Sequence, residues 1–317
     1  MELFFGIDVG KFSFDVHVDP LSESFNVQNN KAGLKEFIER IRTYLRDGHE
    51  VKLVVCEATG GYEKLLVEFL KNNDLPIHVA HANKVRNFAK AIGKLAKTDK
   101  LDAVVIADYA RRLKPPADTR RTDRDLKRLQ GLQLRRRQLL VDLEKEKSRL
   151  DKPIDKDLQR SIQRHIDWIK GEIKSLDKNI GKFIKEREAI KKKIDLITSI
   201  PGVGRNTAVV ILTSLPEIES LENKQLSALV GVAPMNKDSG TKNGKRCIIG
   251  GRLYVRNFLY MATIAGIRFN HLVRSFYKRL RDKGKSAKVA IVAAMHKLLF
   301  IIKAVLQRQS VWVENLA

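Results

Sequence analysis

Residues 3–18 read LFFGIDVGKFSFDVHV, and this stretch decides the fold class of the first third of the chain. It holds two apolar runs, 3–7 and 12–18, which are separated by a turn short enough to make a hairpin. Further strands are expected at 23–28, 51–56 and 76–80, in addition to those at 2–8 and 11–18. Helices are expected at 31–46, 61–73, 82–92 and 98–112. The pattern predicts an α/β domain.

The order of these elements narrows the fold. Three early strands are followed by helix, strand, helix, strand and helix, which is the order of the ribonuclease-H-like fold. The motif Lys114-Pro115-Pro116 breaks the pattern and marks a linker, so the first domain is expected to be 1–114. We expect 115–190 to form a helical arm and 191–317 a mostly helical third domain. The predicted fold class is therefore α/β plus α.

Four acidic residues in the first domain are placed as a metal-dependent nuclease places its ligands. Asp8 ends the first strand-like run, and Glu57 closes the run 51–56. Asp99 and Asp102 stand three apart at a helix start, so both project from one face. Strand ends and helix starts are where an α/β sheet gathers polar groups. Because magnesium prefers carboxylate oxygens, we expect these acids to bind Mg²⁺ and the chain to act on phosphodiesters.

Each acid also has an ordinary interpretation. Asp8 followed by Gly10 fits the phosphate loop of actin-like sugar kinases, but the second loop that such a fold needs is not found in the sequence. Glu57 could cap a helix, and Asp99 could be a first-turn acid favoured by the helix dipole. His78 and His81 lie too far from any cysteine pair for a zinc site and are expected to be core or surface histidines.

The charge of the chain is large and uneven. Lys and Arg number 61 against 37 Asp and Glu, a net charge of +24. Residues 1–110 carry −1, residues 111–190 carry +10 and residues 191–317 carry +15. A near-neutral first domain followed by two basic ones suggests chemistry at one end and grip on a polyanion along the rest. This favours nucleic acid over an anionic membrane.

Other compositional features point to a cytoplasmic protein. The most apolar expected helix, 289–306, is interrupted by His296, Lys297 and Lys303, so we expect that it cannot span a bilayer unaided. No charged-then-apolar leader opens the chain. The two cysteines are too few and too isolated for a disulfide framework or a zinc cluster.

The segment 115–190 is predicted to be an antiparallel helical hairpin. One helix covers roughly 122–150, and Asp151-Lys152-Pro153 interrupt it before the next begins. Apolar residues in steps near three and four make a coiled-coil seam, which comprises Leu158, Ile162, Ile166, Ile169, Ile173, Leu176, Ile180 and Phe183 or Ile184. The arm is either a spacer or a dimerisation element, and its basic stretch 135–137 could lie along a phosphate backbone.

Two motifs in the third domain indicate phosphate chemistry. Residues 197–212 read ITSIPGVGRNTAVVIL and resemble a helix-hairpin-helix element. There Gly202, Gly204 and Arg205 would bring backbone amides to a phosphate, although an ordinary Pro-Gly connection between helices is the alternative. Such contacts position nucleic acid without reading its sequence.

The second motif, GVAPMNKDSGTKNGKRCIIGGRLYVR at 231–256, surrounds Ser239 with cations. A hydroxyl there could attack phosphorus while the cations neutralise the developing charge, although Ser-Gly in a polar loop is often only a turn. The predicted nucleic-acid contacts in this stretch are Lys242, Lys245, Arg246, Arg252 and Arg256, with Lys237 nearby. Tyr254, Phe258 and Tyr260 are expected in the core, with base stacking as the alternative.

Six segments in order resemble one family. FGIDVGKFSFDV, CEATGGYE, KTDKLDA, IPGVGRNTA, GVAPMNKDSG and IGGRLYVRNFLYMA are similar to the motifs of DEDD recombinases of the IS110 insertion-sequence family, which includes Piv-type DNA invertases. The resemblance covers nearly the whole chain. It implies a RuvC-like first domain, metal-binding carboxylates at Asp8, Glu57, Asp99 and Asp102, and a nucleophilic Ser239. One departure is Gly250-Gly251, where many relatives carry Gly-Asn.

The resemblance also implies partners. Family members use a non-coding bridge RNA that pairs with target and donor double-stranded DNA. The acidic domain of one subunit completes a composite site with the serine domain of another, which implies a homo-oligomer, dimer to tetramer. We therefore expect a prokaryotic transposase, nucleoid-associated when active, that forms a phosphoserine–DNA intermediate. A site-specific invertase, a hydrolytic RuvC-type junction nuclease without a covalent intermediate, and a non-catalytic architectural binder are the alternatives.

Overall fold

The computed structural model describes residues 1–94, 99–118, 123–152, 155–235 and 247–314, with the side chains of 99–101 left out. The chain divides into two compact units, residues 1–123 and 124–317. They are described separately below.

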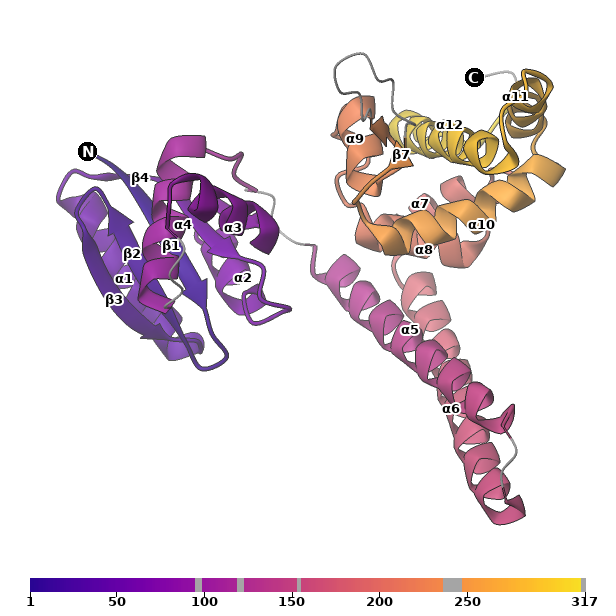
Figure 1. The fold of residues 1–317 in the computed structure, drawn as a ribbon, viewed down its shortest axis with the longest axis horizontal. Coiled ribbons are helices and arrows are strands. Elements are labelled where there is room, and N and C mark those ends of the chain that lie inside the picture. The colour runs from indigo at the N-terminus through magenta and orange to yellow at the C-terminus, as the bar shows by residue number, and fades with distance from the viewer. Residues whose placement is uncertain (95–98, 119–122, 153–154, 236–246, 315–317) are drawn as a thin grey trace. The chain divides into compact units, whose positions relative to one another are not determined.

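A five-stranded mixed sheet forms the centre of the first unit (Figure 1). Its strands are β1 (Glu2–Val9), β2 (Ser13–Asp19), β3 (Glu23–Gln28), β4 (Glu50–Glu57) and β5 (Ile77–Ala80). The order across the sheet is β3-β2-β1-β4-β5. β2 is antiparallel to both of its neighbours, β1 and β3, whereas β1, β4 and β5 are parallel to one another. All five predicted strands are confirmed, with ends that shift by two residues or fewer.

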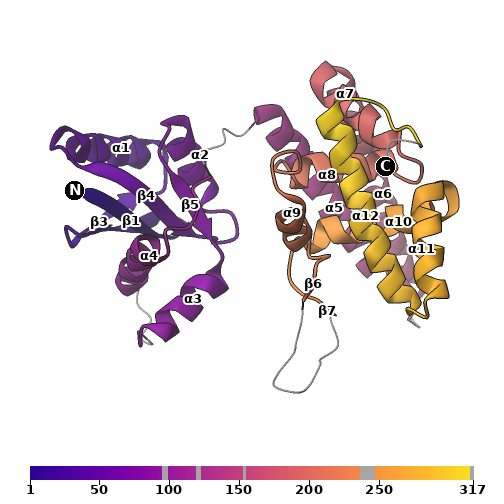
Figure 2. The ribbon, with the colours of Figure 1, turned by 90° about the horizontal axis from the view of Figure 1, so that it is seen from above.

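Helices cover both faces of this sheet (Figure 2). They are α1 (Lys31–Arg46), α2 (Lys64–Asn72), α3 (Ala82–Ala91) and α4 (Asp99–Leu113). One apolar cluster joins α1 and α2 to Leu3, Phe5 and Ile7 of β1. A second cluster joins α3 and α4 to Phe4 of β1 and to Leu53 and Val55 of β4. The two faces of β1 alternate as a pleated strand requires, and the arrangement is consistent with a ribonuclease-H-like fold.

The predicted linker begins on the surface of the first unit. The Asp118 backbone amide donates to the Ile77 carbonyl at 2.7 Å, and Lys71 Nζ contacts the Asp118 carboxylate at the same distance. The Pro116 carbonyl lies 2.9 Å from His78 Nδ1. Residues 116–118 are therefore held against β5 and α2.

In the second unit, α5 (Arg124–Leu150) and α6 (Lys156–Lys185) form a long hairpin (Figure 1). Two polar pairs link the helices, Arg136–Asp177 and Glu146–His165, and a third, Asp125–Arg187, links α5 to the residue that precedes α7. The helices run antiparallel, because the residue number on α6 falls as the residue number on α5 rises. The predicted interruption is confirmed at Asp151 and Lys152, since α5 ends at Leu150 and α6 begins at Lys156, while Pro153 lies outside the described residues. Buried seam residues are Leu139, Leu143, Ile166 and Ile169.

One predicted seam residue is wrong. Leu158 is 60% exposed, because it lies in the first turn of α6 beyond the well-packed part of the hairpin. At the other end of α5, Leu129 is fully buried in the core of the helical bundle that follows. The base of the arm is thus continuous with that bundle.

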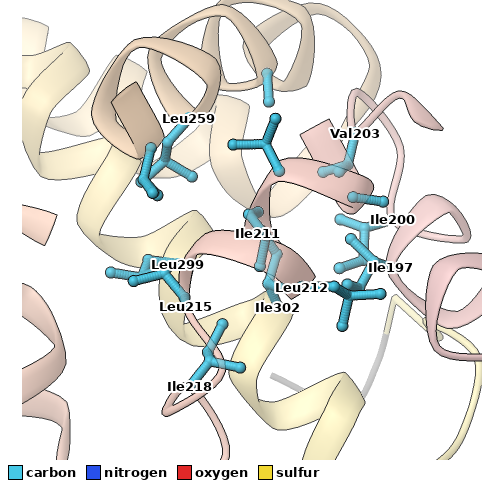
Figure 3. Close-up of a cluster of buried hydrophobic side chains, with 14 of the residues drawn as sticks. Ile197, Ile200, Val203, Ile211, Leu212, Leu215, Ile218, Leu259, Leu299 and Ile302 are labelled. Atoms are coloured by element: carbon cyan, nitrogen blue, oxygen red, sulfur yellow. The ribbon is translucent and has the colours of Figure 1, made fainter. Parts of the chain in front are cut away.

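The rest of the second unit is a bundle of six helices among the described residues: α7 (Glu188–Thr198), α8 (Arg205–Ser214), α9 (Asn223–Val230), α10 (Leu253–Phe269), α11 (His271–Asp282) and α12 (Ala287–Arg308). Two short strands, β6 (Pro234–Met235) and β7 (Cys247–Ile248), pair beside it. Helix α8 is the centre of the core, since every residue from Thr207 to Thr213 is buried (Figure 3).

Helix α12 corrects the expectation about membranes. Within its 22 residues an 18-residue stretch has a mean hydropathy of 2.1, so by length and composition alone it could cross a bilayer in spite of Lys297 and Lys303. Half of that stretch is buried inside the unit, and residues such as Leu298 and Ile302 are fully enclosed. Its apolar character is explained by its place in the core.

Only some of the α10 aromatic residues that were predicted to lie in the core do so. Tyr254 and Phe258 are partly buried against the bundle core and meet edge to face at 5.1 Å between ring centroids. Tyr260 is 43% exposed, so its predicted core position is wrong. Its place in the helix puts it on the side that turns away from α8 and α12.

Candidate active site

Asp8 and Glu57 stand at the same end of two neighbouring parallel strands. Ile7 on β1 is paired with Cys56 on β4, and the next residue along each strand is Asp8 or Glu57. Both positions are half-buried. The carboxyl ends of parallel strands form the edge at which open α/β sheets bind ligands.

The two acids also share a face of the sheet. Side chains alternate between the two faces along a strand, so Asp8 lies on the same face as Phe4, and Glu57 lies on the same face as Leu53 and Val55. Phe4, Leu53 and Val55 all pack into the cluster under α3 and α4. Asp8 and Glu57 therefore continue the α4-covered face beyond its apolar part.

A glycine brings α4 down onto this face. A Cβ atom at Gly6 would lie 2.2 Å from the Ala103 carbonyl oxygen and 2.2 Å from the Ala107 amide nitrogen. Only glycine permits so close an approach of helix backbone to strand backbone. The contact sits two residues before Asp8 and directly after Asp102. It fixes the first turns of α4 over the carboxyl-end edge.

Asp102 belongs to the face of α4 that meets the sheet. It precedes Val105, Ile106 and Tyr109 by three, four and seven residues, and all three are buried in the cluster beneath. Asp102 itself is half-buried. Asp99 is the first residue of α4, but its side chain lies outside the described part.

These donors suit a hard divalent cation in their chemistry, since Asp8, Glu57 and Asp102 offer only carboxylate oxygens. Among the side chains that are described, which exclude Asp99, no three His, Cys, Asp or Glu are close enough to hold an ion. The three acids thus share one end of one sheet face without forming a closed ligand set.

Two residues that the sequence did not single out shape this edge. The Glu63 carboxylate accepts hydrogen bonds from Gly61 N at 2.8 Å, Thr59 Oγ1 at 3.0 Å and Thr59 N at 3.2 Å. Burial acts to raise the pKa of Glu63, but bonds from its own backbone, Gly61 and Thr59 outweigh this and hold the pKa below its ordinary value of 4.5. Glu63 therefore secures the loop that follows Glu57.

Asn29 ties three loops together at the same edge. Its Nδ2 donates to the Gly10 carbonyl at 3.0 Å and to the Tyr62 carbonyl at 3.1 Å, and its backbone amide donates to the Phe12 carbonyl at 2.8 Å. The β1–β2 turn is thereby joined to the loop after β4. The only signal in the sequence was the position of Asn29 after a predicted strand, which gives no hint of these partners.

The other histidines and cysteines take no part in a described metal site. His81 caps α3 by accepting from the Asn83 amide at 3.2 Å, and His78 is held by Pro116. Cys56 is fully buried, which raises the pKa of its thiol to about 12, and Cys247 is exposed. Both cysteines are free, in agreement with the expectation of no disulfide framework.

The predicted helix-hairpin-helix connects α7 and α8. Helix α7 ends at Thr198 and helix α8 begins at Arg205, so residues 199–204 form the connection. Gly202 has φ +93°, and a Cβ there would lie 2.4 Å from the Gly266 amide, so this glycine serves the packing of the turn against α10. Gly204 and Arg205 are exposed at the start of α8, and a Cβ at Gly204 would meet nothing within 4 Å.

Ser239 lies outside the described residues, as do Lys237, Lys242, Lys245 and Arg246. The two ends of their segment are described. β6 pairs with β7, and Gly231 crosses Gly251 so closely that a Cβ at Gly251 would lie 2.3 Å from the Gly231 amide. These contacts form the stem of the segment.

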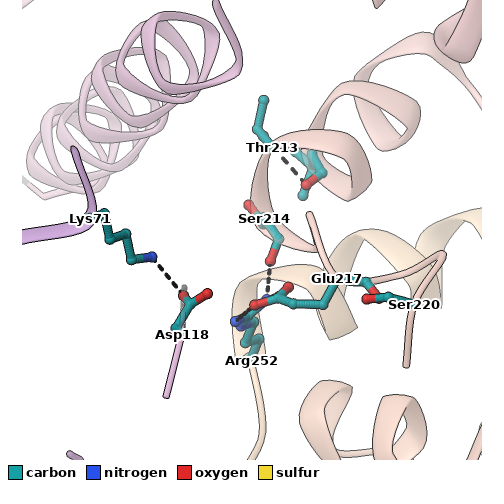
Figure 4. A network of polar contacts seen from close by, with 8 residues as sticks. Lys71, Asp118, Thr213, Ser214, Glu217, Ser220 and Arg252 are labelled. Atoms are coloured by element: carbon teal, nitrogen blue, oxygen red, sulfur yellow. Dashed lines mark hydrogen bonds and ion pairs between the residues drawn. The ribbon is translucent and has the colours of Figure 1, made fainter. Parts of the chain in front are cut away.

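Two predicted phosphate contacts, Arg252 and Arg256, already have partners: Arg252 contacts Ser214 and Glu217 at the end of α8 and just beyond it, and Arg256 contacts the stem. Arg252 makes a bidentate pair with Glu217, 2.8 Å for each bond, and donates to the Ser214 carbonyl at 2.6 Å (Figure 4). Arg256 Nη1 donates to the Gly250 carbonyl at 2.6 Å and to the Gly231 carbonyl at 3.1 Å. Both guanidinium groups hold backbone.

Comparison with known proteins identifies the family. Residues 5–156 match a transposase family model for DEDD proteins of the IS110 type, and residues 194–278 match the model "Transposase IS116/IS110/IS902 family". Pilin gene-inverting proteins of Moraxella bovis and Moraxella lacunata are each 28% identical over 311 residues, which is 96% of this chain and 96% of theirs. An uncharacterised IS110 protein of Streptomyces coelicolor is 25% identical over 43% of this chain and 36% of its own length. This chain belongs to the IS110 family of transposases, enzymes that catalyse phosphoryl transfer on DNA.

Proposed function

We propose that the chain cuts and rejoins DNA with carboxylates at the carboxyl-end edge of its sheet and a serine nucleophile in its second unit. The observation that carries this proposal is the placement of Asp8 and Glu57 at adjacent strand ends on the face that α4 covers. The Gly6 contact adds Asp102 to the same edge. Such an edge is where a RuvC-like domain would hold its catalytic acids.

The metal proposal concerns four residues. Asp8, Glu57 and Asp102, with Asp99 added on the strength of its helical spacing and the family motif, would hold one or two Mg²⁺ ions. When bound, magnesium polarises a scissile phosphate and stabilises the leaving oxygen. The protein's part is to present oxygen ligands at fixed positions, which Glu63 and Asn29 support by securing the loops around Glu57 and Gly10.

Ser239 is proposed as the nucleophile. Its hydroxyl loses a proton and its oxygen bonds to the phosphorus, while one phosphorus–oxygen bond of the strand breaks and the departing sugar oxygen takes up a proton. The phosphoserine ester keeps the energy of the broken bond, so a DNA hydroxyl can reverse the step and reseal the strand. Support comes from the cationic surroundings in the sequence and from the family resemblance.

The partners follow from the same resemblance. The chain would act in the prokaryotic cytoplasm on donor and target duplexes that a bridge RNA selects, as a homo-oligomer of two to four subunits. The exposed start of α8 at Gly204 and Arg205 is a candidate phosphate contact, since its amides are open and the helix dipole favours an anion.

A site-specific DNA invertase is the second candidate. This candidate is supported by proteins named for pilin gene inversion, which align over 96% of this chain and 96% of their own length at 28% identity. An invertase and a transposase of this kind would share the same carboxylates and serine. Sequencing of the rejoined DNA distinguishes them, because inversion joins the same two flanks to a reversed segment, whereas insertion joins the element to a new target sequence.

The test is a search for a covalent protein–DNA adduct. Protein, duplex DNA and the structured RNA encoded beside the gene are mixed with Mg²⁺, and the products are separated under denaturing conditions. We expect an adduct with the wild type, and none with Ser239→Ala, while Ser148→Ala on the arm serves as the matched control. Asp8→Asn and Glu57→Gln should also remove the adduct, and Glu36→Gln should not. Cut DNA with free ends and no adduct would instead establish the hydrolytic nuclease.

A further inference from the structure

A strip of exposed cations lies at the C-terminal end of α11, in the turn after it and at the start of α12. Between residues 268 and 288 the sequence holds eight Lys and Arg and one acid, Asp282. Seven of these cations are exposed and are here called the α11 strip: Arg268, Lys278, Arg279, Arg281, Lys283, Lys285 and Lys288. The strip lies on the outer side of the bundle, where α11 packs beside α10 and α12 (Figure 2).

The strip differs from the other basic surface of this unit in how its charges are balanced. On the arm, several lysines pair with acids one helical turn away, as in Lys145–Asp142 at 3.2 Å and Lys147–Glu144 at 2.7 Å. Within the described residues, no carboxylate lies within salt-bridge distance of any member of the strip. Its positive potential is therefore not cancelled locally, which favours an external polyanion.

The strip is also rigidly mounted. Val273 is fully buried, and Asn270 caps α11 by accepting from the Val273 amide at 3.2 Å. Arg274, the eighth cation, faces inward and donates to the Ile267 carbonyl at 3.1 Å at the end of α10. The Arg279 guanidinium lies 5.2 Å from the centre of the Phe276 ring. These contacts fix the N-terminal end of α11, and at its other end Arg281 Nη1 donates to the Lys285 carbonyl at 2.7 Å.

Its spacing suits the backbone of a duplex. Its three members on α11, Lys278, Arg279 and Arg281, lie within the last five residues of that helix, about 5 Å along its axis, and duplex DNA carries one negative charge per roughly 1.7 Å of its axis. A duplex that crosses this end of α11 would therefore bring several phosphates within reach of the strip. The four lysines of the strip are charges on flexible stems, and none of them forms an ion pair among the described residues, so they fit phosphate contacts that position DNA without reading its bases.

We propose that the α11 strip binds the phosphate backbone of duplex DNA. This deepens the proposed function by adding a grip surface outside the predicted site residues. It rests on the family's action on DNA and does not depend on the carboxylates or on Ser239. Duplex DNA is the committed partner because the family's substrate is DNA.

The experiment compares two triple variants with equal loss of charge. Lys278→Gln, Lys283→Gln and Lys288→Gln neutralise the strip, and Lys145→Gln, Lys147→Gln and Lys170→Gln neutralise paired lysines of the arm. Affinity of the full chain for a fixed duplex is measured over a salt series. For the strip variant we expect a tenfold to hundredfold weaker Kd at about 0.15 M salt and a salt slope lower by about three. The arm variant should change each by much less.

Three outcomes would overturn the proposal. The first is an equal effect of the two triples, which would reflect net charge alone. The second is an unchanged slope in the strip variant. The third is a loss of affinity for a single-stranded RNA of the same length without a loss for the duplex, which would make this an RNA surface. Thermal unfolding should be unchanged in both variants, because all six lysines are exposed.

The readout separates this proposal from the site proposal. At saturating duplex concentration the strip variant should still form the covalent adduct, whereas Ser239→Ala should bind DNA normally and form none. Failure of adduct formation in the wild type would leave the salt-slope comparison fully interpretable.

Discussion

Asp8 on β1 lies directly opposite Asp15 on β2 in the antiparallel register, and both acids belong to the sheet face that α4 covers. The alternation of side chains along β2 supports this, since Phe14 and Val16 pack on the opposite face and Asp19 forms an ion pair with Arg111 of α4. Asn26 Nδ2 donates to one Asp15 oxygen at 3.0 Å. Like charges placed directly opposite each other destabilise a strand pair, and a bound cation would relieve that cost.

The first prediction concerns this pair. Asp8→Asn removes one of the two facing charges, so we expect the free energy of unfolding in EDTA to rise by about 0.5 kcal/mol. The same change should diminish the stabilisation that millimolar Mg²⁺ gives the wild type, since a ligand that binds only the folded state stabilises it. Urea unfolding with EDTA and with Mg²⁺ measures both effects.

Asp15→Asn is the matched control for that experiment. It relieves the same repulsion in EDTA but should keep the response to Mg²⁺, because Asp15 is not among the proposed ligands. Equal responses to Mg²⁺ in wild type and Asp8→Asn would contradict the role of Asp8.

The second prediction tests the approach of α4 to β1. Gly6→Ala places a Cβ atom 2.2 Å from the Ala103 carbonyl oxygen, so α4 must shift away from the strand. Overpacking of this kind costs about 1–3 kcal/mol of unfolding free energy. Gly171→Ala, at an open position of α6, should instead stabilise by up to about 1 kcal/mol. Urea denaturation of the two variants decides; a neutral Gly6→Ala would mean that the contact is easily relaxed.

The third prediction assigns Arg256 to the stem of the serine segment. Arg256→Gln removes charged hydrogen bonds to the Gly231 and Gly250 carbonyls, and each such bond contributes about 1.5–3 kcal/mol. Hydrogen exchange should become faster in 229–235 and 247–252. The slope of DNA affinity against salt should stay unchanged.

Arg135→Gln, on the exposed side of the arm, is the control of equal charge, and it should leave exchange in the stem unaltered. A salt slope lower by about one in Arg256→Gln, with normal exchange, would restore Arg256 as a phosphate contact.

The fourth prediction uses the lowered pKa of Glu63. Because the folded state holds this pKa below 4.5, ionised Glu63 stabilises the fold above the pKa of the unfolded chain. That contribution is lost as pH falls through the folded-state pKa. Wild type should therefore lose unfolding free energy more steeply than Glu63→Gln on going from about pH 5 to pH 3. Parallel pH profiles in the two proteins would contradict the role of its hydrogen bonds.

Elements with strong periodicity were predictable from sequence, and contacts between elements were not. The β1–β2 hairpin and α1 follow from alternation and amphipathic spacing, and the structure places them within two residues of the prediction. That Asp8 and Glu57 lie on the same face of the sheet could be inferred only once the pairing of β1 with β4 was known. Asp15 was missed for the same reason, because its partner depends on the hairpin register.

The roles of particular glycines and arginines were also not predictable from the sequence. Gly202 was read as a phosphate-binding residue, and the structure gives it a packing role against Gly266, a residue 64 positions away that no local pattern connects to it. Arg252 was predicted to contact phosphate and is paired with Glu217. Side-chain type alone does not distinguish a cation that awaits a ligand from one that already holds the backbone.

The constant pairing of the α5–α6 hairpin has a consequence for its length. Arg136 contacts Asp177 and Glu146 contacts His165, so the residue numbers of two facing residues have nearly the same sum at both places along the arm. Seven residues inserted into each helix between these pairs would keep both pairs in register. The tip would move outward by about 10 Å, at 1.5 Å per residue. The arm can thus be lengthened or shortened in steps of seven residues per helix, because each such step preserves the pairing between the two helices.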